Sequence, residues 1–186
     1  MSHADPQRLQ LLPHPSTMSE VVRALRAIVS FADGGRLALQ YQVDADMSRV
    51  VLPSPGGGER ADGLWKHTCF EAFIKRASPV LDPYLELNFS SAPQWAAYAF
   101  DGYRCGMSPV SLASAPQISA RVSSQQLVLD ASLQLPESLR PASKLLLALT
   151  AVIEEDTGSL SYWAARHAPG QPDFHHPDGF VLELPT

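Results

Sequence analysis

Apolar and polar residues alternate with a period of two along much of this chain, which is typical of half-buried β-strands. The alternation runs over residues 21–31 and resumes over 37–43, after the turn residues at 33–35. Glycine accepts the positive φ angles of tight turns, so we predict a β-hairpin over 21–43 with one buried face. The Ala, Leu and Arg residues in 20–30 would also suit a helix, but the partner run downstream favours a strand.

Further runs with strand character follow at short intervals, separated by turn residues. Residues 144–154 are nearly all apolar, which fits a strand buried on both faces or a helix. Their β-branched residues and the turn residues at 155–158 favour a strand. The 16 prolines argue against long helices, because each lacks an N–H donor and clashes inside a helix. The other runs cover residues 68–75, 84–89, 95–100, 117–122, 127–133, 160–165 and 180–184.

This succession of strands predicts an all-β fold, a two-sheet antiparallel β-sandwich that is immunoglobulin-like or jelly-roll-like. The length of 186 residues suits one domain, which we place at residues 20–186. Residues 1–19 contain three prolines and little periodicity. We therefore expect them to form a loose N-terminal lead-in.

Net charge and the distribution of apolar residues indicate which classes of partner and which cellular compartment to expect. The net charge is −5 and no cluster of basic residues occurs, which disfavours nucleic acid as a partner. The sequence has no apolar run long enough for a membrane span and no apolar signal-peptide core in residues 1–10. We therefore expect a cytoplasmic protein without a membrane partner. There Cys69 and Cys105 should stay reduced and buried as small hydrophobic residues, although a disulfide between them is geometrically possible.

Catalytic and metal-binding signatures are weak. The sequence contains no Gly-x-Ser-x-Gly motif, no phosphate-binding loop and no Cys-x-x-Cys pair. His67 and Cys69 would share one strand face about 7 Å apart, too far for a nucleophile and its base. The adjacent His175 and His176 point in opposite directions on an extended chain, so at most one of them joins His167 at a metal. Hydrogen bonds to loop backbone are the simpler interpretation of these histidines.

Polar residues on two predicted strands favour a binding surface. Glu71, Glu86 and Asn88 have the parity opposite to the aliphatic residues around them. A sugar site combines aromatic surfaces for the C–H face of the ring with carboxylates and amides for its hydroxyls. Spacing alone favours a core of aromatic residues under an ordinary solvated face over a sugar site, and both interpretations stay open. Aromatic residues recur on or beside the strands at Trp65, Tyr84, Trp95, Tyr98, Tyr103, Tyr162 and Trp163.

Two groups of segments resemble a known family. The first group is LWKHTCFEAFI at 64–74, YLELNFS at 84–90 and WAAY at 95–98. The second is LSYWAARH at 160–167 and PDFHH at 172–176. Together they resemble bacterial DOMON-like domain proteins, which are similar to the C-terminal part of family 9 carbohydrate-binding modules. The resemblance extends over nearly the whole chain from about residue 20.

The resemblance implies a β-sandwich that binds its ligand on a sheet face, with Glu71 as the best single match to the family's acidic strand residues. In family 9 modules two tryptophans clamp a sugar and calcium can be bound structurally. The clamp candidates here are Trp65, Trp95 and Trp163. Haem-binding DOMON relatives use Met and His as axial ligands, which here would be Met107 with His67, His167 or His175.

We therefore predict a non-catalytic binding module for a small, carbohydrate-like ligand, with no cofactor; calcium and haem enter only through the resemblance. Two alternatives stay open. One is a haem-binding or metal-binding protein of the DOMON type, and the other is an uncharacterised enzyme that uses His67 and His167 with a carboxylate. The candidate ligand-binding residues are Trp65, His67, Glu71, Glu86, Asn88, Trp95, Trp163, His167 and His175.

Overall fold

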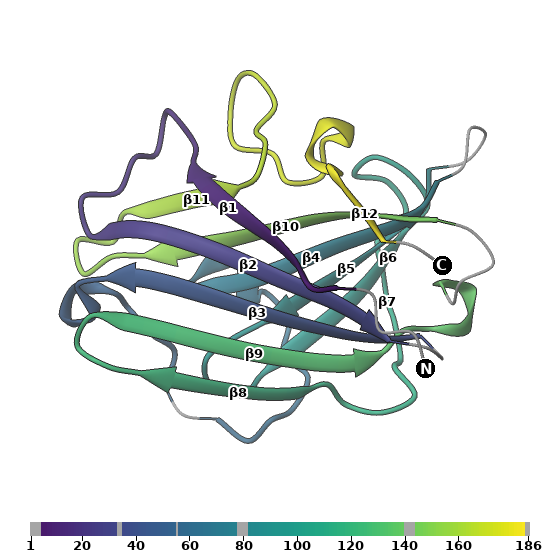
Figure 1. Ribbon diagram of the computed structural model, residues 1–186, viewed down its shortest axis with the longest axis horizontal. Helices are drawn as coiled ribbons and strands as arrows, with labels where there is room; N and C mark the ends of the chain where they lie inside the picture. The colour runs from purple at the N-terminus through teal and green to yellow at the C-terminus, as the bar shows by residue number, and fades with distance from the viewer. Residues whose placement is uncertain (1–4, 33–34, 55, 78–81, 140–143, 185–186) are drawn as a thin grey trace.

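The computed structural model describes residues 5–32, 35–54, 56–77, 82–139 and 144–184, and their regular structure is almost entirely β (Figure 1). The strands are β1 (Gln7–Pro13), β2 (Val22–Ala32), β3 (Arg36–Ala45), β4 (Cys69–Arg76), β5 (Tyr84–Phe89), β6 (Trp95–Phe100), β7 (Ser108–Pro109), β8 (Gln117–Val122), β9 (Gln126–Gln134), β10 (Leu145–Glu154), β11 (Leu160–Ala164) and β12 (Leu182–Leu184). The helical elements are short 3₁₀ turns, η1 (Met47–Arg49), η2 (Leu64–Lys66), η3 (Glu137–Leu139) and η4 (Pro177–Gly179). Within the described ranges, none of these helices has the length and apolar character needed to cross a membrane.

One antiparallel sheet contains all of these strands. Its order is β7-β6-β5-β4-β10-β11-β1-β2-β3-β9-β8, and β12 adds to β10 beside β11. The joining strand is β1, whose residues Gln7 to Leu11 pair with β2 while Leu12 and Pro13 pair with β11. The sheet curls at this point, so that β2, β3, β9 and β8 lie in front of β4, β5 and β6 in Figure 1.

The core fills the space between the two halves of the curled sheet. The rings of Tyr41 on β3 and Phe70 on β4 lie 5.1 Å apart, and the Tyr41 hydroxyl donates a 2.6 Å hydrogen bond to the Glu71 carbonyl oxygen. Alternate residues of most strands enter this core, including Leu25, Leu39, Leu87 and Leu149. Each such side chain contributes about 1.5–3 kcal/mol by leaving water, so strand parity decides which face is buried.

The all-β, antiparallel part of the predicted fold is confirmed. Residues 21–43 form the β2–β3 hairpin as predicted, with 33–34 outside the described residues, and the helical alternative for 20–30 is wrong. The expectation of a loose lead-in over 1–19 is also wrong for residues 7–13, because they form β1. Hydrogen bonding joins the strands into one curled sheet, so the finer prediction of two separate sheets stays a prediction.

A second hydrophobic cluster lies on the outer face of the half that contains β4, β5, β6 and β10. It consists of Phe73, Tyr84, Ala96, Tyr98, Phe100 and Ala148, with Leu64, Trp65, Phe174 and Phe180 packed against it. The last four residues come from η2 and from the segment that follows β11, which arches over the sheet in Figure 1. A simple half-buried strand pattern would imply that this outer face is open to solvent. In the structure it is covered by loops.

Candidate ligand-binding site

A cavity of about 360 Å³ opens on this covered outer face. Its volume lies at the lower end of the range for small-molecule sites, about 300–1,000 Å³. The strands β4, β5, β6, β10 and β11 and the loops above them all contribute to it. The lining residues are Trp65, Glu71, Glu86, Phe100, Arg104, Met107, Val152, Tyr162, Pro172, Phe174 and His175.

Two carboxyl groups, from Glu71 and Glu86, line the cavity on neighbouring strands. In the β4–β5 pairing Glu71 lies opposite Asn88 and Phe73 lies opposite Glu86, so the two glutamates share the outer face on a diagonal. Their side chains are almost fully buried, since Glu71 is 2% exposed and Glu86 is 4% exposed. Carboxylates are rarely buried so completely without a specific partner.

Few hydrogen bonds support these carboxyl groups. Glu86 Oε1 accepts a 2.7 Å bond from Asn88 Nδ2, and Glu71 Oε2 accepts a 3.3 Å bond from Thr150 Oγ1. Asn88 Oδ1 in turn accepts from the Cys69 thiol at 3.5 Å. Asn88 therefore lies behind Glu86 and orients it, and it is not among the residues that line the cavity.

The environment disfavours two negative charges at this position. Burial, and then the negative charge of Glu86, raise the pKa of Glu71 well above its ordinary value. Burial also raises the pKa of Glu86, while the hydrogen bond from Asn88 lowers it. The pair therefore holds a proton at a higher pH than exposed glutamates do, and its members titrate together.

A neutral histidine lies next to this pair. The Tyr84 hydroxyl is 2.8 Å from His175 Nδ1, and it accepts a 3.2 Å hydrogen bond from the Arg104 backbone N–H. Burial, and then the positive charge of Arg104, lower the pKa of His175 to about 4, so the ring is neutral at pH 7. If the Tyr84 hydroxyl donates to Nδ1, the ring proton lies on Nε2, which is 3.9 Å from Glu86 Oε2. The imidazole then presents an N–H donor to the cavity.

Arg104 is held at the cavity by a carboxylate from the covering loop. Its Nη2 and Nε atoms donate to Asp173 Oδ1 at 2.7 and 3.1 Å. The Tyr103 hydroxyl also donates to Asp173, and the His175 backbone N–H donates to it at 3.1 Å. The backbone of Arg104 has a positive φ of 53°, which is uncommon for a residue with a side chain. This turn brings the loop after β6 and the loop after β11 together above the two glutamates.

Aromatic rings make up most of the remaining wall. Trp65 packs edge-on against Tyr98 with ring centroids 5.6 Å apart, and Phe100 stacks on Tyr84 at 4.7 Å. On the opposite side Tyr162 contacts Phe174 at 5.8 Å. The cavity thus combines apolar surfaces with a few oriented polar groups, which is the usual composition of a small-molecule site.

Trp65, Glu71, Glu86 and His175 are the predicted site residues that the structure brings together at this cavity. Trp95 and Trp163 are instead part of the core between the two halves of the sheet. The Trp163 indole N–H donates to Ser161 Oγ at 2.9 Å inside the protein. The three tryptophans therefore do not face one another across a ligand site. Of the three, Trp65 is the one that lines the cavity.

His67 and His167 lie in separate surroundings. His67 Nδ1 is 2.7 Å from Glu154 Oε2, and its side chain is exposed. His167 Nε2 donates to the Leu12 carbonyl oxygen at 2.8 Å, and its ring contacts Phe174. They share no contact in the part of the chain that the structure describes, so the geometry does not assemble the enzyme alternative that was based on them.

The two cysteines are free thiols in different environments. Cys69 is buried, as expected, but Cys105 is exposed in the tight turn after β6, which it closes by pairing with Gly102. The hydrogen bonds of the Cys69 thiol go to Asn88 and to the Phe70 carbonyl oxygen, and not to His67.

Metal and haem ligands were further expectations from the resemblance. Over the described ranges, no group of three or more His, Cys, Asp or Glu side chains is placed to hold a metal ion. Met107 and His175 do line the same cavity, but His175 Nδ1 is already paired with Tyr84. The haem and calcium expectations stay predictions.

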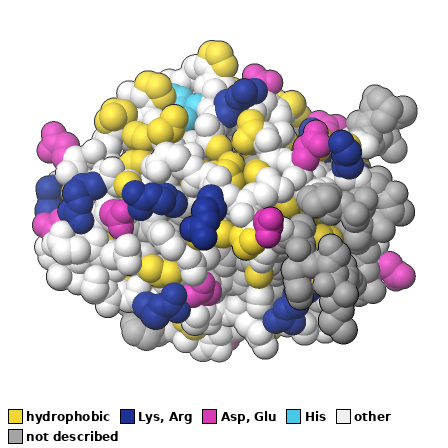
Figure 2. Space-filling model, viewed as in Figure 1, with side chains coloured by type: hydrophobic (Ala, Val, Ile, Leu, Met, Phe, Trp, Pro, Cys, Tyr) yellow, Lys and Arg dark blue, Asp and Glu magenta, His cyan; other side chains and the backbone are white. Residues whose placement is uncertain are grey.

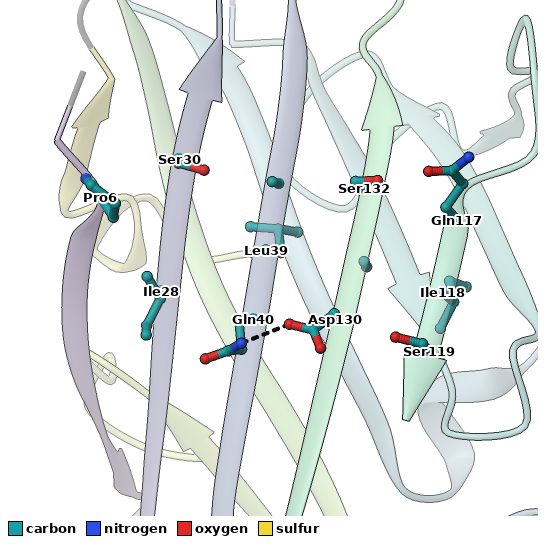
Figure 3. A pocket seen from close by; sticks show the side chains of 12 residues that line it. Pro6, Ile28, Ser30, Leu39, Gln40, Gln117, Ile118, Ser119, Asp130 and Ser132 are labelled. Atoms are coloured by element: carbon teal, nitrogen blue, oxygen red, sulfur yellow. Dashed lines mark hydrogen bonds between the residues drawn. The ribbon is translucent and has the colours of Figure 1, made fainter. Parts of the chain in front are cut away.

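A depression of about 380 Å³ lies on the outer face of the other half of the sheet, across β2, β3, β9 and β8 (Figure 3). Its polar side chains bond to each other, as in the 2.7 Å bond from Gln40 Nε2 to Asp130 Oδ1, and Arg121 pairs with Asp130 at 2.8 Å. It contains none of the predicted site residues. In the view of Figure 2, acidic and basic side chains are interspersed over the surface instead of gathering by sign.

No family model and no curated protein matches the sequence. A candidate carbohydrate-binding protein from Bacteroides uniformis has a similar structure, with a TM-score of 0.61 and 13% identity over 95% of this chain and 84% of that chain.

Two structures of a family 9 carbohydrate-binding module from Caldicellulosiruptor kristjanssonii are also similar. The glucose complex has a TM-score of 0.51 and 10% identity, over 83% of this chain and 72% of that chain. The cellotriose complex has a TM-score of 0.50 and 10% identity, over 87% of this chain and 75% of that chain. Identities this low show the fold alone, so this chain has the curled, antiparallel all-β fold that these carbohydrate-binding proteins also have.

Proposed function

We propose that this protein binds a small carbohydrate in the cavity beside Glu71, Glu86 and Trp65, and that it does not transform it. One observation carries the proposal: two buried carboxyl groups and an indole ring converge on one concave site on an outer sheet face. Hydroxyl-rich ligands need such acceptors, and their C–H faces need such apolar walls. The similar structures include complexes with glucose and cellotriose, which supports the same class of ligand here.

Each polar group of the cavity would have a separate task. The glutamates accept hydrogen bonds from ligand hydroxyls, and Arg104 and His175 donate hydrogen bonds to ligand oxygens. Trp65 and Tyr162 offer ring surfaces on either side. Met107 and Val152 complete the apolar lining.

The finer parts of the sequence-based assignment are also proposals. They comprise the DOMON-like label, a division of the curled sheet into two sandwich layers, a bacterial source, a cytoplasmic location, no nucleic-acid or membrane partner, and binding without a cofactor. The DOMON-like label rests on the segments at 64–74 and 160–167 alone.

Calorimetry with glucose, cellobiose, cellotriose and other neutral sugars tests the proposal. Trp65 is the tryptophan at the cavity, so tryptophan fluorescence should change on binding in the native protein and not in a Trp65→Phe variant. A Gln40→Ala variant, altered on the opposite outer face, serves as the matched control and should bind like the native protein. NMR spectra of the bound sugar should show no turnover. Heats of dilution only, across the whole panel, would refute a carbohydrate ligand.

A further inference from the structure

The two buried glutamates have no cationic partner in the part of the chain that the structure describes. His175 is the basic group nearest to them, at 3.9 Å from Glu86, and burial keeps its ring neutral at pH 7. A buried carboxylate that lacks a cation is unstable unless it binds a proton or a ligand that supplies the missing charge.

Arg104 does not fill this role, although it lines the same cavity. Its guanidinium group is held by Asp173 through bonds of 2.7 and 3.1 Å. This pairing balances the charge of Arg104 with a carboxylate outside the glutamate pair. Arg104 lowers the pKa of Glu86 from a distance, but among the described residues it forms no ion pair with either glutamate. The charge that remains unmatched at the cavity is therefore negative.

The glutamates also keep free acceptor capacity on the cavity side. Glu71 Oε2 accepts a long bond of 3.3 Å from Thr150, and no described residue donates to Glu71 Oε1. Glu86 Oε1 is occupied by Asn88, whereas Oε2 has only the 3.9 Å approach of His175. An ammonium group has three N–H donors and no acceptor, so it matches two such oxygens.

Aromatic rings add to the same preference. Trp65, Phe100, Tyr162 and Phe174 line the cavity around the carboxyl groups. The faces of aromatic rings carry partial negative charge, and they attract cations most strongly where water is excluded. Rings and carboxylates together form the kind of cage that recognises amines.

We propose that the ligand of this cavity carries a protonated amine, so that the site prefers an amino sugar such as glucosamine over the corresponding neutral sugar. The inference rests on the proposed function and narrows it to a class of carbohydrate. The amine lies between the carboxyl groups of Glu71 and Glu86, and the sugar ring lies against Trp65.

Calorimetry at low salt and about pH 6.5 tests the preference, because amines of the α-amino type are protonated below about pH 7.7. The ligands are glucosamine, glucose and N-acetylglucosamine, of which only the first carries a charge. We expect glucosamine to bind at least about tenfold more tightly than glucose, as a desolvated ion pair should give. N-Acetylglucosamine, which lacks the charged amine, should bind no more tightly than glucose.

The Glu71→Gln variant separates charge from shape, because the amide keeps the size of the carboxyl group. It should bring the affinity for glucosamine to within about twofold of the affinity for glucose, both measured on the same variant. Glu86→Gln provides the second variant, with thermal melting of both as the check on folding. The Gln40→Ala control should keep the preference of the native protein for glucosamine over glucose.

The possible failures are distinct. Equal affinities for glucose and glucosamine in the native protein, or a preference that survives both glutamine substitutions, would overturn the amine inference and leave carbohydrate binding in place. Binding of none of these sugars would overturn the proposed function together with the inference.

Discussion

Acid should destabilise this protein through His175. The ring has a pKa of about 4 in the folded protein instead of the ordinary 6.5, with burial as the first cause and the positive charge of Arg104 as the second. The side chain is 17% exposed, so solvent screening is limited. The titratable groups that face the ring are Tyr84 and Glu86 on β5, Arg104 after β6, and Asp173 beside Arg104.

The sign follows from proton counting. Between pH 6.5 and about 4 the unfolded chain binds a proton on this histidine and the folded chain does not. Stability from His175 is therefore fully present above pH 6.5 and is lost as pH falls through this window. Each pH unit corresponds to about 1.4 kcal/mol, so the loss by pH 4 amounts to about 3 kcal/mol.

Glu71 and Glu86 act in the opposite direction. Their pKa values are raised in the folded protein, so their contribution is present below the ordinary value of 4.5 and is lost as pH rises. The pH dependence of the native protein is the sum of both effects. A comparison with a His175→Gln variant isolates the histidine.

Urea unfolding of the native protein and of His175→Gln at several pH values between about 4 and 7.5 measures the difference. The stability advantage of the native protein should shrink by about 3 kcal/mol from neutral to acidic pH. His176→Gln is the matched control, because the side chain of His176 is 36% exposed and, among the described residues, its Nδ1 contacts only Asp178, through the backbone N–H at 3.3 Å and the carboxylate at 3.8 Å. A gap between native and His175→Gln that stays constant with pH would refute the assignment of a buried, neutral imidazole.

Four further outcomes are expected. Trp65→Ala should weaken sugar binding at least about tenfold with little loss of stability, as measured by calorimetry and thermal melting, because the indole lies at the cavity wall. Glu71→Gln should raise the melting temperature at neutral pH, because the amide removes a carboxyl group whose ionisation burial opposes; a lower melting temperature would argue against this. Cys105 should react with a thiol reagent in the native protein while Cys69 reacts only on unfolding, and equal rates would contradict their placement. Leu11→Ala should cost about 2–5 kcal/mol in urea unfolding, because its side chain is fully buried at the joining strand.

Strand parity was enough to predict that Glu71 and Glu86 point away from the aliphatic core. Aliphatic residues alternate with Glu71 on β4 and with Glu86 on β5, so the direction of each carboxyl group follows once the strands are recognised. What parity could not show is that loops cover this face and bury both groups. The same alternation would be read in a strand whose polar face is open to water.

The tryptophans show where parity fails. Strand β6 has small alanines on both of its faces, so the pattern does not reveal that Trp95 faces the core. In β11, Tyr162 and Trp163 are adjacent, and only one of them can face outward. The structure places Tyr162 at the cavity and Trp163 in the core.

Long-range contacts account for the rest of what was missed. Arg104 and Phe174 belong to loops about 70 residues apart, and nothing local indicates that these loops meet above one sheet. Strand β1 carries a short alternation over Arg8 to Leu11, in which Gln10 separates Leu9 from Leu11, but the prolines around it obscured this signal. The residues next to β1 in the sequence likewise do not indicate that it pairs with both β2 and β11.

The bridging position of β1 has a consequence for truncation. A chain that began after residue 13 would leave the facing edges of β2 and β11 without hydrogen-bond partners, and both edges would be free to pair with other molecules. Removing these N-terminal residues as if they were an irregular tail would therefore separate β2 from β11, which β1 joins, and would favour aggregation. Expression tags or fusion partners are better attached outside Gln7–Pro13, with those residues kept intact.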